Sequence, residues 1–453
     1  MSAPARRPAI ATQDEAPGLA SRRVAARLLA AVVEARTSLD GLTDAGGGHP
    51  EYRRLDARDR GLVKAILMAA LRRRGTVEAI LAACLDRPLP GKAASLRTLL
   101  HIGAAQILFL DVPDSAAVDT SVELARADPR NARFTGLVNA ILRRVSREKE
   151  AFLARFDDPA LDCPPWLFER LVAAYGEPRA RAIALAHRRP APLDLSVKAD
   201  AAGWAERLGG EALATGTVRL PPLDRAVTEL AGFAEGAWWV QDAAAALPAR
   251  LLGEVSGSTV ADLCAAPGGK TAQLAAAGAR VSAFDISKSR MKRLQENFAR
   301  LGLSAETHIG DLRALAAREP FDAVLLDAPC SSTGTIRRHP DVAYTKDAAE
   351  IGKLAGVQAA LLAAAAGLVR PGGRLVFSNC SLDPVEGEAV VEAFLAARPD
   401  YARLPVRPAE LPGLEEAVTS AGEVRTTPDM LDRGTPSRSG LDGFFAARLA
   451  RLG

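Results

Sequence analysis

Apolar residues recur at three- and four-residue spacings through the first third of the chain, from Val24 to about Val145. This spacing places them on one face of an α-helix. The segments with this period are 24–33, 61–71, 96–110 and 134–145, and Pro and Gly fall mainly between them. The pattern predicts an all-helical domain of roughly five or more helices over residues 21–146.

The helical period weakens between residues 147 and 236, where proline pairs interrupt the chain. Leu193 to Val197 alternates apolar and polar residues, as a half-buried strand does. We therefore expect a connector helix and a small α/β unit here. The adjacent Trp238 and Trp239 could stack on a nucleobase, but such a pair more often packs at the edge of a domain, and we favour packing.

Strand and helix patterns alternate over residues 237–453. The predicted strands are short apolar runs, at 260–264, 280–286, 306–310, 321–327 and 374–380. The predicted helices lie between strands, at 287–301 and 347–369. Such alternation is typical of an α/β domain with a parallel sheet covered on both faces, in which ligands bind at the carboxyl ends of the strands.

Composition agrees with a soluble multidomain protein. The chain has 453 residues, 48% of them hydrophobic and 25% charged, which predicts roughly two or three domains. A net charge of +4 is compatible with a nucleic-acid partner but does not establish one. The longest nearly apolar run, 357–369, is shorter than the ~18 to 20 residues of a membrane span. Residues 1–20 lack the apolar core of a signal peptide, so we expect a disordered lead-in and a cytoplasmic protein.

The cysteines predict neither disulfides nor a metal. The five are scattered without a Cys-x-x-Cys pair, at Cys84, Cys163, Cys264, Cys330 and Cys380. This spacing suits a reducing compartment. We assign no chemistry to Cys84 and Cys163, and we expect a monomer with no bound metal.

A glycine-containing loop follows the apolar run Val260 to Leu263 and precedes a helical segment. Glycines let a ligand approach the backbone closely, and the helix start favours polar or anionic groups. The ATP-binding P-loop pattern fits only at Gly269-Lys270-Thr271, because Cys264 replaces its first glycine and Pro267 lacks an N–H donor. Asp285 ends the next strand, near the place of the ribose-binding acid in Rossmann-type folds. A nucleoside-binding corner is therefore favoured.

Two thiols lie at the ends of two other predicted strands. Cys330 follows Asp327-Ala-Pro after strand 321–327, and Cys380 ends strand 374–380. If these strands are neighbours, at the usual ~4.8 Å spacing, both sulfurs can face one crevice beside the ligand. A single cysteine would most often be a buried inert residue. Two at equivalent strand ends, one of them beside Asp327, indicate chemistry.

The helical domain resembles the NusB-like RNA-binding domain. The resemblance rests on residues 96–110, 116–125 and 136–144. It implies that this domain contacts RNA, and basic clusters within it could contact phosphates. The candidates are Arg72, Arg73 and Arg143.

The strand-end motifs resemble the signatures of RNA 5-methylcytosine methyltransferases. They occupy residues 262–271, 327–334 with 336–341, and 379–384 with 386–388. With the NusB-like domain and residues 440–449, nearly the whole chain resembles the bacterial 16S ribosomal RNA cytosine-C5 methyltransferases of the Sun/RsmB type. One departure is Asn379, where the family commonly has threonine, and we expect it to alter only the hydrogen bonds around Cys380.

The resemblance implies a Rossmann-like class I methyltransferase domain that uses S-adenosylmethionine. It implies that Cys380 is the nucleophile that adds to C6 of cytosine, that Cys330 removes the C5 proton, and that Asp327 faces N3 and the exocyclic amine of the base. We expect Lys270 or a helix dipole to activate Cys380. The implied cofactor-binding residues are Cys264, Ala265, Ala266, Pro267, Gly268, Gly269, Lys270, Asp285, Arg290, Asp311 and Asp327. Arg337 and Arg338 follow the catalytic loop and could bind RNA phosphates.

Four other functions stay open at this point. The first is a P-loop ATPase. The second is a methyltransferase for protein amide nitrogen, although such enzymes have Asn-Pro-Pro-aromatic where this chain has Asp327-Ala-Pro-Cys330. The third is the same chemistry on another RNA, such as tRNA, and the fourth is a non-catalytic RNA-binding factor in ribosome assembly.

Overall fold

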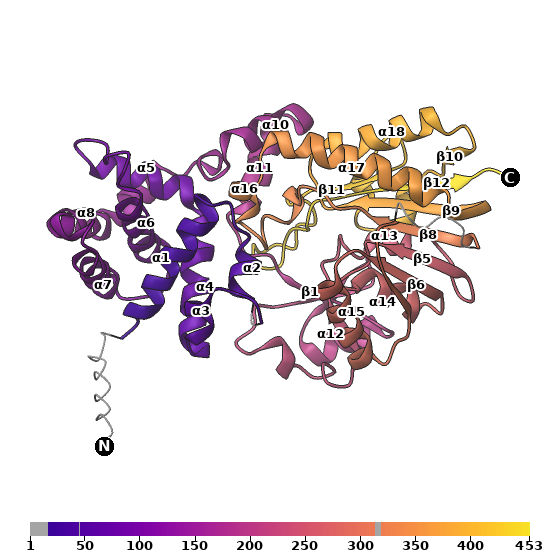
Figure 1. The fold of residues 1–453 in the computed structure, drawn as a ribbon, viewed down its shortest axis with the longest axis horizontal. Coiled ribbons are helices and arrows are strands. Elements are labelled where there is room, and N and C mark those ends of the chain that lie inside the picture. Colours follow the sequence, from indigo (N-terminus) through magenta and orange to yellow (C-terminus); the bar gives the residue numbers. More distant parts are fainter. Residues whose placement is uncertain (1–16, 45, 313–318) are drawn as a thin grey trace, which may run out of the picture. The chain divides into compact units, whose positions relative to one another are not determined.

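The computed structural model describes residues 17–44, 46–312 and 319–453 of the chain, which divides after Asp162 into two compact units (Figure 1). Most of the expected lead-in, residues 1–16, lies outside the described residues. Its last two residues, Leu19 and Ala20, already belong to the first helix.

The N-terminal unit is all-helical among its described residues, as predicted. Its α-helices are α1 (Leu19–Val33), α2 (Leu39–Thr43), α3 (Pro50–Arg54), α4 (Ala57–Arg72), α5 (Arg74–Cys84), α6 (Ala94–Phe109), α7 (Asp114–Ala127), α8 (Thr135–Arg147) and α9 (Lys149–Arg155). The apolar α6 is the central helix and packs against α1, α4, α5, α7 and α8. Gly103 allows the close approach of α8, since a Cβ there would lie 2.7 Å from Leu142 Cδ1.

The N-terminal unit extends further along the chain than the predicted boundary at residue 146. Helix α9 and the turn Pro159–Asp162 belong to it. The Asp162 carboxylate accepts hydrogen bonds from Thr76 N and Thr76 Oγ1 at 2.7 and 2.9 Å, and it pairs with Arg73 at 3.3 Å. These bonds fasten the turn to α5, so the segment folds with the helical unit.

The C-terminal unit begins with two helices and a small sheet. The helices are α10 (Pro165–Tyr175) and α11 (Glu177–His187). The sheet has the order β2-β3-β1-β4 and is antiparallel, with α12 (Ala201–Leu208) between its strands, which are β1 (Leu193–Val197), β2 (Glu211–Ala212), β3 (Thr217–Leu220) and β4 (Trp238–Val240). The sequence predicted β1 but not the other strands. Trp238 and Trp239 are both buried, which confirms packing as their role.

A fully buried ion pair supports this small sheet. Arg219 on β3 donates to both carboxylate oxygens of Asp194 on β1, at 2.7 and 2.8 Å, and neither side chain is exposed. Asp194 also accepts from Ala243 N at 3.0 Å. The pair therefore ties the small sheet to the segment that leads into the main sheet.

We expect Arg219→Met to lower the free energy of unfolding of the C-terminal unit by about 3–5 kcal/mol, because it leaves the Asp194 carboxylate buried without its cation. Urea denaturation measures this loss. The matched control is Arg225→Met, which removes an exposed arginine from its pair with Asp224. A loss no larger than the ~0 to 1 kcal/mol of a surface pair would contradict the expectation.

The main sheet positions the functional residues. Its described strands have the order β10-β12-β9-β8-β5-β6-β7, with β11 paired to β12. They are β5 (Thr259–Leu263), β6 (Arg280–Asp285), β7 (Glu306–Ile309), β8 (Phe321–Asp327), β9 (Val369–Asn379), β10 (Tyr401–Arg403), β11 (Val424–Thr426) and β12 (Phe444–Arg451). Strands β5 to β9 are parallel and match the five predicted strands. The sheet is nevertheless mixed, because β12 runs antiparallel to β9.

Helices cover both faces of this sheet (Figure 1). On one face lie α13 (Leu247–Arg250), α14 (Gly269–Ala276) and α15 (Lys288–Leu301), and on the other lie α17 (Ala348–Ala366) and α18 (Glu388–Ala397), with the short α16 (Val342–Thr345) before them. Val260, Leu325 and Val376 pack into the core on the first face. Leu263, Leu326 and Phe377 pack on the second. The strands are therefore apolar on both sides, as parallel strands covered by helices usually are.

Among the described residues one helix, α17, is long and apolar enough to cross a membrane by length and composition alone. It begins earlier than the apolar run 357–369 and has 19 residues. Its Leu361, Leu362 and Ala366 are buried, and the helix packs against β8 and β9. Such burial indicates a helix that covers a sheet.

Candidate active site

The glycine loop lies between the end of β5 and the start of α14. Cys264 and Gly268 adopt positive φ angles of 59° and 102°. A Cβ at Gly268 would lie 2.7 Å from Leu294 Cγ, so glycine is required there. Thr271 donates a hydrogen bond of 2.6 Å to Asp262 Oδ2 and thereby ties the strand to the first turn of the helix. Burial raises the pKa of Asp262 to about 7.

Asp285, at the end of β6, lies against this loop. Its carboxylate accepts from Ala266 N at 3.2 Å and from Ser287 N at 2.8 Å. Arg290 lies 3.9 Å from the same carboxylate and donates to Ala266 O. The next strand end presents Ile309, which is followed by the half-buried Asp311. The predicted cofactor residues are therefore brought together along the carboxyl ends of β5, β6 and β7.

Cys330 and Cys380 are in direct contact. Strands β8 and β9 are neighbours, with Asp327 opposite Ser378, and the two thiols follow these positions. Their sulfur atoms are 3.4 Å apart, and both cysteines are free. The strands are therefore neighbours, and the two thiols lie together as expected for that arrangement.

The contact shifts the pKa values of the two thiols in opposite directions. A hydrogen bond from Cys330 lowers the pKa of Cys380, with smaller help from Ser332 and Lys270, against the opposing effect of burial. The same hydrogen bond, with burial and the charge of Glu386, raises the pKa of Cys330 well above its ordinary value. These opposite shifts favour Cys380 over Cys330 as the thiolate of the pair. Lys270, which we expected to activate Cys380, contributes less than Cys330 does.

Asp327 is fixed beside the thiols. Lys270 Nζ lies 2.7 Å from Asp327 Oδ2, and Ser378 donates to Asp327 Oδ1 at 2.9 Å. The Lys270 ammonium also lies 4.9 Å from the centre of the Phe444 ring, on β12. Asp327 is thus held in one orientation, with its side chain 31% exposed.

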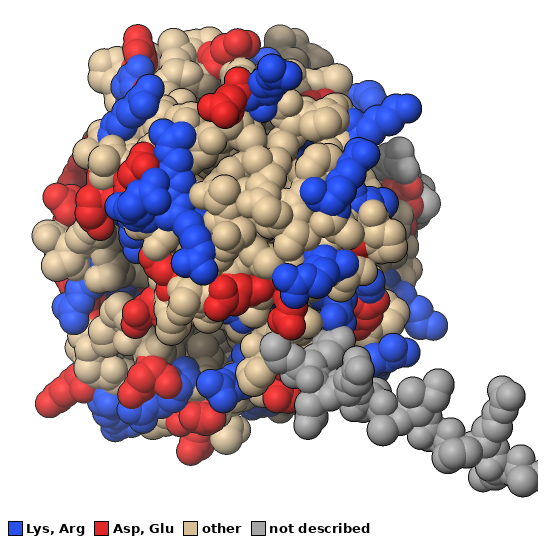
Figure 2. Space-filling view, turned by 90° about the vertical axis from the view of Figure 1, so that its left-hand side faces the viewer, with Lys and Arg blue, Asp and Glu red and all other residues tan. Residues whose placement is uncertain are grey.

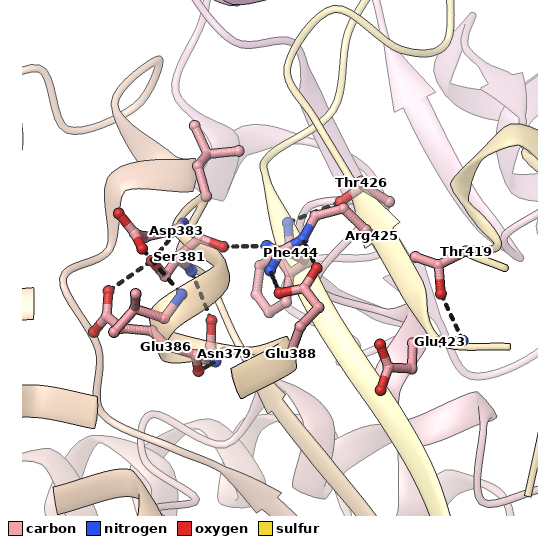
Figure 3. Close-up of polar contacts among 12 residues, drawn as sticks. Asn379, Ser381, Asp383, Glu386, Glu388, Thr419, Glu423, Arg425, Thr426 and Phe444 are labelled. Carbon is pink, nitrogen blue, oxygen red and sulfur yellow. Dashed lines mark hydrogen bonds and ion pairs between the residues drawn. The ribbon is translucent and has the colours of Figure 1, made fainter. Parts of the chain in front are cut away.

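The segment that carries Cys380 is held by β9 and β11 (Figure 3). Asn379 donates to Glu386 O at 2.6 Å and accepts from Ser381 N at 2.9 Å. Arg425 donates to Ser381 O and forms a two-point ion pair with Glu388, at 2.6 and 3.1 Å. As expected, Asn379 takes part in the hydrogen bonds around Cys380, and it does so with both ends of its amide.

Comparison with known proteins places the chain in a family. A model of the 16S rRNA methyltransferase RsmB/F family matches residues 249–450, and the NusB family model matches residues 19–147. Two proteins named ribosomal RNA small subunit methyltransferase B are similar over nearly their full length. The one from Xylella fastidiosa is 40% identical, over 96% of this chain and 98% of its own, and the one from Xanthomonas campestris is 39% identical, over 98% and 99%.

The chain belongs to the RsmB/F family of 16S rRNA methyltransferases. A crystal structure of a methyltransferase homolog protein from Pyrococcus horikoshii is also similar. It is 28% identical with a TM-score of 0.52, and the match covers 63% of this chain and 94% of that one. The predicted fold, a NusB-like helical domain with a Rossmann-like methyltransferase domain, is confirmed.

In this RsmB/F family member, two arginines that we expected to bind RNA phosphates, Arg337 and Arg338, bond to other parts of the protein instead. Arg337 is only 2% exposed, and its guanidinium donates to Pro428 O and Leu441 O. Arg338 pairs with two carboxylates, those of Asp242 and Asp442. The prediction of phosphate contacts is wrong for Arg337, because its guanidinium is buried. The guanidinium of Arg338 forms its ion pairs within the protein. Both arginines instead join the loop after Cys330 to the segment before β12.

The basic residues of the NusB-like unit differ in their surroundings. Arg73 pairs with Asp162 and lies 4.6 Å above the Phe109 ring, and Arg72 is half-buried. Arg143 is exposed and bonds to Asn139. On the face of the molecule that Figure 2 shows, basic and acidic side chains are interspersed and do not form one continuous basic patch. RNA binding by these arginines stays a prediction.

The opposite pKa shifts of the thiols predict different reactivity. Iodoacetamide alkylates thiolates. We therefore expect Cys380 to be alkylated before Cys330 at neutral pH, and its rate to level off at a lower pH than that of an ordinary cysteine. In Cys330→Ala the hydrogen bond is lost, so the pKa of Cys380 rises and its rate at neutral pH falls. Peptide mass spectrometry between about pH 6 and pH 10 measures both rates. Equal rates for the two thiols would contradict the assignment.

Sequence reasoning missed the residues behind the thiols. Glu386, Gln358 and Ser331 form a buried hydrogen-bonded group beneath both cysteines. Glu386 stands inside one of the recognised motifs, which was the available signal, but spacing alone gave it no role. The Lys270–Asp327 pair was also missed, because the two residues are 57 positions apart.

Proposed function

We propose that this chain methylates C5 of cytosine in 16S ribosomal RNA, with S-adenosylmethionine as methyl donor and Cys380 as nucleophile. The observation that carries the proposal is the 3.4 Å contact of two free thiols, beside Asp327 and next to the glycine loop. The description of the family, 16S rRNA methyltransferase RsmB/F, and the names of the relatives, which specify small-subunit ribosomal RNA, support 16S ribosomal RNA as the substrate.

A nucleophile is needed because C5 of cytosine is a weak carbon nucleophile. The Cys380 thiolate forms a bond to C6, and the electron pair of the C5=C6 bond becomes available at C5. The lowered pKa of Cys380 favours the thiolate that this addition requires. After methylation the C5 proton must leave, and its bonding electrons then restore the double bond and expel the Cys380 sulfur from C6.

Cys330 is suited to take the C5 proton after Cys380 has reacted. In the free protein its pKa is raised chiefly by its hydrogen bond to Cys380. Once the Cys380 sulfur is bonded to C6, it carries no charge to hold that proton. The pKa of Cys330 then falls, its proton passes to water, and the Cys330 thiolate can accept the proton from C5. The contact between the thiols thus keeps Cys330 protonated, and so unable to act as a base, until Cys380 has reacted.

Asp327 is placed to bind the target base. Lys270 and Ser378 fix its carboxylate beside the thiols. There it would face N3 and the exocyclic amine of cytosine, and it would favour the protonated ring that accepts thiolate attack. Because C6 is inaccessible within a stacked helix, the target nucleotide must be single-stranded or flipped out.

The loop at the ends of β5 to β7 fits S-adenosylmethionine. Asp285 offers a carboxylate to ribose hydroxyls, and Gly268, in a positive-φ conformation, lets the loop turn into α14 beside it. Ile286 and Ile309 are 72% and 53% exposed, which is unusual for such apolar side chains and provides apolar surface for a purine. When bound, the cofactor supplies an electrophilic methyl group. The residues that would hold it also include Cys264 to Lys270, Arg290 and Asp311.

We expect Asp285→Ala to weaken S-adenosylmethionine binding by about 10- to 100-fold, the effect of losing hydrogen bonds to a charged group. Isothermal titration calorimetry measures the change. Glu296→Ala on α15 removes an exposed carboxylate and serves as control. An unchanged dissociation constant would remove Asp285 from the proposed cofactor site.

The function itself is tested with the full-length protein, tritiated S-adenosylmethionine and either protein-free 16S RNA or tRNA. The expected result is 5-methylcytosine in the 16S RNA alone, identified by nucleoside mass spectrometry. Tritium label in tRNA would show that the substrate is an RNA other than 16S RNA. Transfer to neither RNA, from a protein that binds both cofactor and RNA, would favour a non-catalytic assembly factor.

A further inference from the structure

A buried carboxylate lies beneath the two thiols and bonds to both segments that carry them. Glu386, at the end of the short 3-10 helix η6 (Pro384–Glu386), has no exposed surface. Its carboxylate accepts hydrogen bonds from Ser331 N at 2.9 Å, from Ser331 Oγ at 2.5 Å and from Ser381 Oγ at 2.6 Å. Ser331 directly follows Cys330, and Ser381 directly follows Cys380. One side chain therefore joins the residues next to both thiols.

Gln358 completes the set of donors. From α17 it donates to Glu386 Oε1 at 3.1 Å and to Pro329 O at 3.0 Å. Pro329 directly precedes Cys330, so the Cys330 segment is held on both sides of the thiol. With Gln358 the Glu386 carboxylate accepts four hydrogen bonds, which is about the number that two carboxylate oxygens can accept.

These bonds have a clear physical consequence. An ionised carboxylate is costly to bury unless its oxygens are hydrogen-bonded, and bonds to a charged acceptor are roughly twice as strong as neutral ones. The hydrogen bonds of the Glu386 carboxylate go to Ser331, Ser381 and Gln358. Strands β8 and β9 fix the ends of the two segments, but the thiols lie beyond the strands. The carboxylate adds a constraint at that point to the direct hydrogen bonds between the segments, which run from Gly334 N to Cys380 O at 2.9 Å and between Ser331 Oγ and Ser381 Oγ at 3.1 Å.

We propose that Glu386, supported by Gln358, is a positioning residue that sets the distance between Cys330 and Cys380. The inference rests on the proposed function for its catalytic consequence, but not for the spacing of the thiols. The length of the side chain is its decisive property, because the carboxylate must reach Ser331 and Ser381 at once.

Three variants of the full-length protein test this idea. Glu386→Asp keeps the charge and shortens the side chain by a methylene, whereas Glu386→Gln keeps the length and loses the charge. Glu392→Asp on α18 is the matched control, since its carboxylate is 64% exposed. One readout is capture by phenylarsine oxide, which must bind two neighbouring thiols and needs no RNA. The other is the steady-state kinetics of RNA methylation.

We expect Glu386→Asp to lower kcat by about 100-fold, the scale of a misplacement of about 1 Å, with KM for RNA unchanged. Arsenical capture should slow in parallel, Glu386→Gln should fall between Glu386→Asp and wild type, and Glu392→Asp should match wild type. The inference would be overturned if Glu386→Asp kept the wild-type kcat and the wild-type rate of arsenical capture. It would also be overturned if Glu386→Gln lost more of either than Glu386→Asp.

Two further results separate the possible failures. If Glu386→Asp does not fold, Gln358→Met preserves side-chain volume and removes one donor, and a smaller loss in both readouts is expected; no loss would count against the inference. If the wild-type protein forms no 5-methylcytosine but arsenical capture still slows in Glu386→Asp, the proposed function fails while the positioning role stands.

Discussion

Cys380→Ala is expected to lower methyl transfer to 16S RNA by more than about 10³-fold, the scale seen when an enzymatic nucleophile is removed. Without a sulfur at this position nothing adds to C6, and C5 stays a weak nucleophile. Removing Cys380 also removes the hydrogen bond that chiefly raises the pKa of Cys330, but the Cys330 sulfur lies after β8, 3.4 Å from the sulfur that the proposal places at C6, so it does not take over the attack. S-adenosylmethionine binding should persist, since the glycine loop and Asp285 are unchanged.

The measurement is single-turnover transfer of a tritiated methyl group, followed by scintillation counting of the RNA. Cys84→Ala in the N-terminal unit is the control, because this half-buried thiol lies outside the site. Activity of Cys380→Ala within about tenfold of wild type would remove Cys380 as nucleophile, since such a loss is too small for the missing covalent step.

Cys330→Ala is expected to accumulate a covalent complex between protein and RNA. The variant keeps the Cys380 thiol and can still form the bond to C6, and the methyl group can still be transferred. It then lacks the base that takes the C5 proton, so the Cys380 sulfur is not expelled. Loss of the hydrogen bond from Cys330 also raises the pKa of Cys380, which should slow formation of the adduct without preventing it.

A denaturing gel of Cys330→Ala incubated with labelled RNA and S-adenosylmethionine measures the adduct as a band of reduced mobility. The double variant Cys330→Ala with Cys380→Ala should form none. Free methylated RNA released by Cys330→Ala at the wild-type rate would show that another group removes the C5 proton.

The sequence predicted the catalytic fold well because its signals are local. The strands that end at Asp285, Asp327 and Asn379 are short apolar runs between helical segments, so their pattern can be read along the chain. The adjacency of β8 and β9 was only a condition of the sequence analysis, because the pattern along the chain does not give the order of strands in a sheet, and the structure supplies it. Strand β12 was missed, although Phe444–Arg451 pairs along β9, because nothing local distinguishes an antiparallel final strand from a loop.

The failures lie where tertiary contacts override local chemistry. An Arg-Arg pair after a catalytic loop suggests phosphate binding, yet Arg337 is buried and Arg338 pairs with Asp242 and Asp442, which are far away in the chain. The contact between Cys330 and Cys380 became visible only when β8 and β9 were placed side by side. Glu386 had a place in a motif, but its role depends on bonds to two separate segments.

The most direct test of the account identifies the atom that is bonded to RNA. The Cys330→Ala protein is trapped with 16S RNA and S-adenosylmethionine, digested with protease and nuclease, and its crosslinked peptide is sequenced by mass spectrometry. The expected product is a peptide that contains Cys380, with a methylated cytidine attached to the sulfur. Attachment through any other residue, or a stable complex without a covalent bond, would contradict the assignment of Cys380 as the nucleophile.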